Sequence, residues 1–98
     1  MNRAEAFAGL GKVADAVRAR GATSLYVFGS VARDESRTDS DVDLFIDYDS
    51  ASKFSLVDLV GIKNLIEDEL GVEVDIATRD SLDPRVLDLI EKSAIRVF

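Results

Sequence analysis

The sequence contains no cysteine and no histidine, and each absence removes a class of chemistry. Without cysteine, disulfide bonds and thiolate metal sites are excluded. Without histidine, the chain lacks the usual general base and the imidazole metal ligand. Any metal ion held by this chain must therefore be bound through oxygen, which favours Mg²⁺, Mn²⁺ or Ca²⁺.

Positive charge and long apolar runs are also scarce. Twelve Lys and Arg against 19 Asp and Glu give a net charge of −7, so a general affinity for nucleic acid is not expected. A single nucleotide is still compatible with this charge, because a metal ion can supply positive charge locally. No apolar run is long enough to cross a bilayer and the N-terminus lacks a signal peptide, so we expect a cytoplasmic protein with no membrane contact.

The length of 98 residues predicts a single domain, residues 1–98, with no room for a second core. Apolar spacing predicts helices over residues 4–19, 55–70 and 83–93. Strands are predicted over 24–28, 41–47 and 72–77, and a short last strand is compatible with 95–98. Strands interleaved with helices indicate an α/β (α+β) domain, a small mixed β-sheet covered by helices.

The predicted helix over residues 55–70 has clear ends. Ser55 followed by Asp58 is typical of an N-terminal capping box, and Gly71 marks the end of the helix. The apolar spacing predicts a buried side on which a lysine is the exception, made of Leu56, Leu59, Val60, Lys63 and Ile66.

Three aspartates stand on the polar faces of predicted strands. Asp41 and Asp43 are two residues apart, so both project from the same face of the 41–47 strand. Like charges held side by side are unfavourable without a cation, whereas a hard divalent cation prefers such oxygen ligands. Asp75 occupies the polar face of the 72–77 strand. If the two strands are neighbours, three carboxylates converge and suit two cations about 3.5–4 Å apart.

The end of the first strand has features of a phosphate-binding turn. Gly29 allows close approach of a phosphate to the backbone, where N–H groups of a tight turn bind anions. The Ser30 hydroxyl adds a donor, and Arg33 is placed to pair with a phosphate. Arg33 is equally compatible with a surface ion pair to Glu35 or Asp39.

Gly29-Ser30, followed after ten residues by Asp41-Val42-Asp43, resembles the motif of the DNA polymerase β-type nucleotidyltransferases. It is most similar to their minimal bacterial branch, the MNT domains. The resemblance runs from about residue 25 to 78. Either half of the pattern alone is weak evidence, but both at this separation are specific. The resemblance implies the polymerase β-like nucleotidyltransferase fold.

The family resemblance also implies roles for these residues. Asp41 and Asp43 would bind both Mg²⁺ ions, and Asp75, at the family's third acidic position, would bind one of them and help deprotonate the attacking hydroxyl. Gly29 and Ser30 would cradle the triphosphate of ATP. Attack on the α-phosphate would release pyrophosphate. Family members often have glycine after the arginine, whereas this chain has Asp34.

A protein partner is a further implication of the resemblance. Minimal members commonly pair with a HEPN toxin, a small all-α ribonuclease, and silence it by attaching AMP, expected at a tyrosine hydroxyl. The expected function is therefore a Mg²⁺-dependent protein adenylyltransferase acting as an antitoxin. One alternative is a non-catalytic antitoxin that occludes the toxin. Another is a nucleotidyltransferase for a small molecule, although such enzymes usually carry an extra helical domain.

Several other residues are expected to have no functional role. Asp47 shares a strand face with Asp43 but lies four residues further on, so we expect it to be solvent-exposed. Lys63 and Arg79 are expected at the surface as well. Phe28 and Phe45 are expected in the core or at a partner contact rather than stacked on a base.

Overall fold

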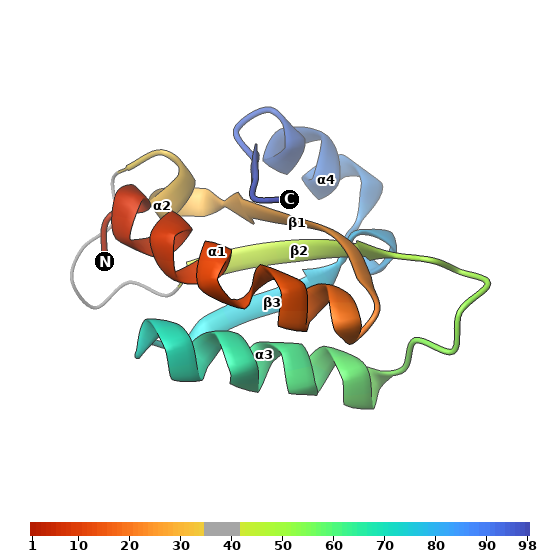
Figure 1. Cartoon of the computed structure of the whole chain (residues 1–98). Helices are drawn as coiled ribbons and strands as arrows, with labels where there is room; N and C mark the ends of the chain where they lie inside the picture. The colour runs from red at the N-terminus through yellow and green to blue at the C-terminus, as the bar shows by residue number, and fades with distance from the viewer. Residues whose placement is uncertain (35–41) are drawn as a thin grey trace.

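The computed structural model describes residues 1–34 and 42–98 and shows a sheet with helices on both sides (Figure 1). In chain order its elements are α1 (Arg3–Ala19), β1 (Ala22–Phe28), α2 (Gly29–Ala32), β2 (Val42–Tyr48), α3 (Leu56–Leu70), β3 (Val74–Thr78), the 3₁₀ turn η1 (Arg79–Ser81), α4 (Pro84–Glu91) and β4 (Ile95–Arg96).

The sheet is mixed, as predicted. Its strand order is β3-β2-β1-β4, so β3 and β4 form the two edges. β1 runs antiparallel to both β2 and β4, whereas β2 and β3 are parallel. The short last strand is present and pairs with the middle of β1. The predicted fold class is therefore confirmed.

The hydrophobic core lies between one face of the sheet and the helices α1 and α3, which run side by side beneath it (Figure 1). Val42, Leu44 and Ile46 of β2 are completely buried there, as the alternation of this strand predicts. Leu10 of α1 and Ile66 of α3 meet them from the helical side. Because successive side chains of a strand point to opposite faces, the odd-numbered residues of β2 project away from α1 and α3.

The predicted helix ends agree with the structure. Ser55 and Asp58 form the expected capping box, and Gly71 ends α3 in the left-handed conformation at φ 70°. The Asp83 side chain caps α4 by accepting a hydrogen bond from the backbone N–H of Arg85 at 2.8 Å. α4 ends at residue 91, slightly earlier than expected.

The predicted buried side of α3 was right for Ile66 and for Leu59, which packs partly buried against the core, and wrong for Leu56 and Val60. Ile62 and Ile66 are fully buried, whereas Leu56 is 73% exposed and Val60 is 47% exposed. Apolar residues occupy a wide arc of this helix, and periodicity does not say which part of the arc meets α1 and β3. Packing selects the part centred on Ile62, which leaves Leu56, Val57 and Val60 facing outward.

Among the described residues, no helix combines the length and apolar character that a membrane span requires.

Candidate functional site

The parallel pairing of β2 and β3 brings two of the three predicted aspartates together. Asp43 and Asp75 are direct partners in the register of the two strands. Their neighbours Val42 and Val74 are also partners and are buried in the core, so both aspartates project to the opposite face. Adjacent strands lie about 4.8 Å apart, which places the two carboxylates within reach of one shared ion.

The two carboxylates differ in exposure. Asp43 lies on a central strand and is half-buried, whereas Asp75 lies on the edge strand and is exposed. Asp41 lies outside the described residues. Within residues 1–34 and 42–98, no group of three acidic side chains is close enough to hold a metal ion. The described part of the site therefore consists of the pair Asp43 and Asp75.

Gly29 fits directly against Asp43. It follows Phe28, which is the partner of Asp43 across β1 and β2. Its φ of 73° is a left-handed conformation that favours glycine. A Cβ at this position would come within 2.4 Å of Oδ2 of Asp43. Both the backbone conformation and the space therefore require glycine here, and the turn packs on the aspartate.

Ser30 and Arg33 lie in and just after the short helix α2, at residues 29–32, rather than in an irregular turn. Ser30 is half-buried, while the Arg33 side chain is exposed. The backbone N–H of Arg33 donates to the Gly29 carbonyl at 3.2 Å and closes this helical turn. Gly29, Ser30 and Arg33 thus form one compact segment beside Asp43.

Asp34 adopts the left-handed conformation with φ 58°. Glycine is the residue that takes this conformation most readily, and aspartate tolerates it better than most others. Oδ1 of Asp34 also accepts a hydrogen bond from the backbone N–H of Arg3 at 3.2 Å. Aspartate is therefore accommodated at this position, and its side chain ties the end of the α2 segment to the start of α1.

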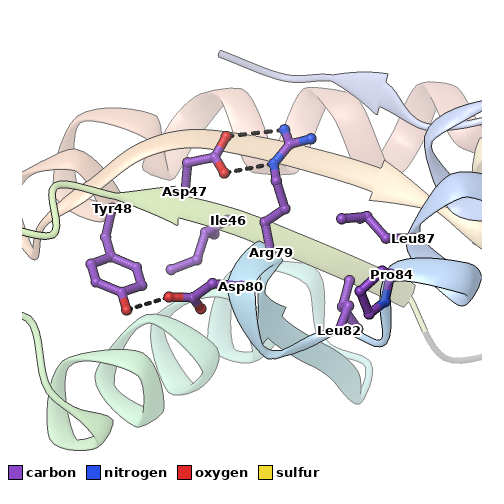
Figure 2. Close-up of a pocket in the computed structure, with 8 residues that line it drawn as sticks. All are labelled: Ile46, Asp47, Tyr48, Arg79, Asp80, Leu82, Pro84 and Leu87. Atoms are coloured by element: carbon purple, nitrogen blue, oxygen red, sulfur yellow. Dashed lines mark hydrogen bonds and ion pairs between the residues drawn. The ribbon is translucent and has the colours of Figure 1, made fainter.

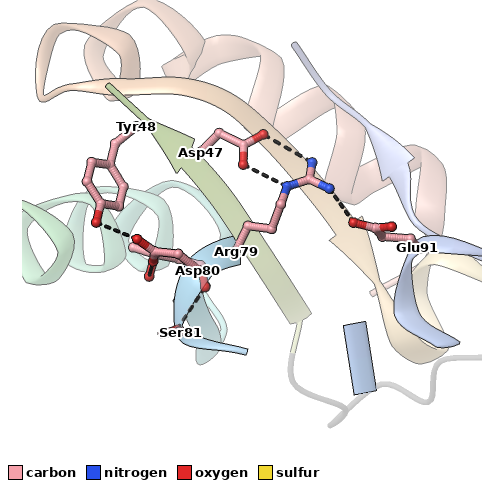
Figure 3. Close-up of polar contacts among 7 residues, drawn as sticks. Asp47, Tyr48, Arg79, Asp80, Ser81 and Glu91 are labelled. Carbon is pink, nitrogen blue, oxygen red and sulfur yellow. Dashed lines mark hydrogen bonds and ion pairs between the residues drawn. The ribbon is translucent and has the colours of Figure 1, made fainter. Parts of the chain in front are cut away.

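The expectation that Asp47 and Arg79 are simple surface residues was wrong. Arg79 Nε donates to Asp47 Oδ1 at 2.7 Å and Nη2 donates to Oδ2 at 3.0 Å, which makes a two-bonded ion pair (Figure 3). The two side chains are only 30% and 31% exposed. Arg79 Nη1 also bonds to Glu91 of α4. Arg79 therefore connects β2, the end of β3 and α4.

Two aromatic rings support the same guanidinium group. The Arg79 Cζ atom lies 4.9 Å from the centroids of both Tyr26 and Phe45. These rings stack on each other at 4.8 Å, and Phe45 is completely buried, as expected of a core residue. The hydrogen bonds from Arg79 to Asp47 are the main reason that the pKa of Arg79 rises above its usual value.

The sequence contains a signal for this ion pair. The segments Val42-Asp43-Leu44 and Val74-Asp75-Ile76 are alike, and 32 residues separate each position from its counterpart. The same separation links Asp47 to Arg79. Aligning the two segments by their Val-Asp pairs would have predicted opposite charges facing each other at positions 47 and 79.

A surface hollow of about 300 Å³ lies at this end of the strands, with the ion pair in its wall (Figure 2). It is lined by Ile46, Asp47, Tyr48, Arg79, Asp80, Leu82, Pro84 and Leu87. Asp43 is four residues away from Asp47 along β2, which corresponds to about 13 Å. The hollow is therefore separate from the aspartate pair.

Paired carboxylates on neighbouring strands, next to a glycine turn that opens a helix, are the arrangement that the sequence motif predicts for a nucleotidyltransferase. Comparison with known proteins agrees. The family model described as "Nucleotidyltransferase domain" matches residues 10–97, so the chain belongs to this family.

Individual relatives narrow this class. The chain is 39% identical over 75 residues to a protein of Methanocaldococcus jannaschii named "Putative protein adenylyltransferase MJ1217", covering 76% of this chain and 74% of that protein. It is 30% identical over 77 residues to "Protein adenylyltransferase MntA" of Thermococcus cleftensis, covering 79% and 76%.

Solved structures show the same fold. A structure described as a "putative minimal nucleotidyltransferase" superimposes with a TM-score of 0.84 at 36% identity, over 97% of this chain and 95% of that one. The MNT antitoxin in a complex with a tri-AMPylated Shewanella oneidensis HEPN toxin gives a TM-score of 0.67 at 14% identity, over 92% and 69%. The fold is that of the minimal nucleotidyltransferases.

Proposed function

We propose that this chain transfers AMP from ATP to a hydroxyl group of a partner protein, a HEPN-type toxin that it thereby neutralises. Family membership supports nucleotidyl transfer. Relatives named as protein adenylyltransferases support a protein acceptor. A similar fold occurs in an antitoxin bound to a tri-AMPylated HEPN toxin, which supports the class of partner. A tyrosine is the acceptor that the family resemblance implies.

The described residues fit a divalent cation. Asp43 and Asp75 face each other in register on neighbouring strands, and the chain offers oxygen ligands only. We assign Asp43 and Asp75, together with Asp41, as the residues that would hold two Mg²⁺ ions. Bound Mg²⁺ neutralises charge on the triphosphate and increases the electrophilicity of the α-phosphorus.

The chain's own residues account for the remaining steps. Gly29 lets the turn pack closely on Asp43, the Ser30 hydroxyl donates a hydrogen bond to the triphosphate, and Arg33 pairs with a phosphate oxygen. Asp75 accepts the proton of the acceptor hydroxyl as the hydroxyl oxygen bonds to the α-phosphorus. The bond from the α-phosphorus to the bridging oxygen breaks, and pyrophosphate leaves with the electron pair.

The observation that carries the proposal is the pairing of Asp43 with Asp75 on the face of the sheet that the core does not occupy. That arrangement is unfavourable for stability and useful for binding a cation. We propose that the single domain, residues 1–98, is sufficient for this activity when the partner supplies the acceptor.

The test is transfer of label from α-labelled ATP to the purified partner in the presence of Mg²⁺. We expect Asp43→Asn to reduce transfer by about 10²-fold or more, since a metal ligand is lost. Asp68→Asn makes the same chemical change at an exposed position of α3 and should leave transfer intact. Equal transfer by Asp43→Asn would exclude the assigned metal site. Full neutralisation of the toxin by Asp43→Asn would instead favour occlusion without catalysis.

A further inference from the structure

The same sequence separation relates the Asp43–Asp75 pair and the Asp47–Arg79 ion pair. A separation of 32 residues pairs Asp43 with Asp75 across β2 and β3. The same separation pairs Asp47 with Arg79 through two hydrogen bonds. It also pairs Tyr48 with Asp80, at 2.6 Å between the hydroxyl and Oδ2. The two strands therefore keep one register from the aspartates to the start of η1.

The charges at the two ends of this register have opposite effects. Like charges facing each other on neighbouring strands weaken the pairing, whereas opposite charges strengthen it. Asp43 opposite Asp75 is the unfavourable kind, and Asp47 opposite Arg79 is the favourable kind. Asp47 lies four residues beyond Asp43 on the same face of β2. Arg79, the first residue of η1, lies four residues beyond Asp75 and bonds to Asp47, so both pairs report the same register.

β3 depends on this help because it is an edge strand with β2 as its one neighbour in the sheet. At its start, Glu67 Oε2 accepts a hydrogen bond from the Val74 N–H at 3.0 Å, but this contact ties β3 to α3 rather than to β2. At its end, Arg79 bonds directly to β2 through Asp47. A slip of β3 by one residue would turn Asp75 to the other face.

Arg79 is itself held in place. Its guanidinium plane lies over Tyr26 and Phe45, and Glu91 bonds to it from α4. Figure 3 shows the Arg79 side chain between Asp47 and Glu91, with the fork directed at Asp47. A two-bonded arginine–carboxylate pair of this kind fixes direction as well as distance.

We propose that Arg79, through its fork to Asp47, is a positioning residue that holds β3 in the register where Asp75 faces Asp43. Its importance for catalysis rests on the proposed function, but its effect on the register does not. Arg79 acts through β3 and touches neither the substrate nor the ion.

The first test is amide hydrogen exchange of β3 in metal-free buffer. Arg79→Met keeps an unbranched apolar side chain and removes the fork. We expect exchange of the β3 amides to accelerate by about tenfold or more. In a background of Asp75→Asn, where the opposing charge is gone, the same substitution should accelerate exchange by no more than about threefold.

Equal acceleration in both backgrounds would mean that Arg79 contributes packing alone, and the proposal would fail. Unchanged exchange in Arg79→Met would overturn it as well. If Arg79→Met does not fold, Asp47→Asn is the milder variant, because Arg79 keeps its contacts with Glu91 and the rings. Asp47→Asn should then accelerate exchange of the β3 amides more with Asp75 present than in the Asp75→Asn background, although by a smaller factor than Arg79→Met. Equal acceleration in both backgrounds would again reject the proposal.

The second test is binding of Mn²⁺ alone, followed by its paramagnetic signal. We expect Arg79→Met to weaken Mn²⁺ binding by about tenfold and Arg79→Lys, which keeps the charge but loses the fork, by less. Tyr48→Phe is the matched control, because it removes the neighbouring cross-strand bond at an exposed position. It should change Mn²⁺ affinity by no more than about twofold. Undiminished affinity in Arg79→Met would contradict the proposal.

These readouts separate this proposal from the proposed function. Hydrogen exchange and Mn²⁺ binding need no partner and no AMP transfer. A wild-type chain that binds Mn²⁺ but modifies no protein would leave the register role intact while rejecting the function. Equal AMP transfer by the wild type and by Arg79→Met would leave the proposed function intact and reject the importance of Arg79 for catalysis.

Discussion

The two ends of the β2–β3 pair make opposite use of the same geometry. At one end Asp43 faces Asp75 and the glycine turn packs against Asp43. At the other end Asp47 faces Arg79, which also binds Glu91 and two aromatic rings. The first end places like charges where a cation is useful, and the second neutralises its charges within the chain. In such a small protein, favourable charges at the Asp47–Arg79 end can offset the repulsion at the Asp43–Asp75 end.

The largest change in stability at the Asp43–Asp75 end is expected from Gly29→Ala. The left-handed φ and the contact with Asp43 should make this variant less stable by about 1–3 kcal/mol. Urea unfolding followed by circular dichroism measures the change.

Gly11→Ala is the matched control for that substitution. Gly11 lies within α1 and has no neighbour within 4 Å of the added methyl group, so the variant should gain about 0.5–1 kcal/mol. A Gly29→Ala protein as stable as wild type would show that the turn does not press on Asp43.

A smaller effect of opposite sign is expected from Asp75→Asn without metal. Removing one of two facing like charges should raise stability by about 0.2–1 kcal/mol. Differential scanning calorimetry in chelator measures it. Added Mn²⁺ should stabilise the wild type more than the variant, because the variant lacks a ligand. A clear loss of stability in metal-free Asp75→Asn would indicate a structural role for this carboxylate.

The smallest effect belongs to the other end of the strands. Hydrogen bonds from Thr78 first and from Tyr48 second lower the pKa of Asp80. A lowered pKa in the folded state favours folding above the unfolded value, and this contribution is lost as the pH falls through the folded pKa. Thr78→Val should therefore raise the pKa of Asp80 toward its ordinary value, and Tyr48→Phe should raise it less. A carboxyl-detected NMR titration compares the two variants, and a larger shift in Tyr48→Phe would reverse the assigned order of causes.

The strands and helices could be predicted because their signals are local. Alternation over residues 41–47 and 72–77 predicts which side chains share a face, and the structure has Val42, Leu44, Ile46 and Val74 in the core. Capping residues at 55 and 83 and the glycine at 71 predict where helices begin and end. These features depend on neighbours in the chain and need no knowledge of the fold.

Other features could not be predicted locally. Leu56 and Val60 were misassigned to the buried side of α3 because α1 and β3 cover only part of its apolar arc. Asp47 and Arg79 were misassigned because an isolated charge looks the same whether water or an opposite charge faces it. The roles of Asp43, Asp75, Gly29, Ser30 and Arg33 stay predictions, as does the role of Asp41, which lies outside the described residues.

The sequence by itself determined the residue types and their faces: aspartates on the polar side of two strands, a glycine at the end of a third, and oxygen as the one ligand type available. Only the tertiary structure decided that β3 lies beside β2 and in which register. Backbone hydrogen bonds between strands form equally well in many registers, so the choice depends on side chains that are distant in sequence. Here those side chains include Asp47 and Arg79, 32 residues apart and in direct contact.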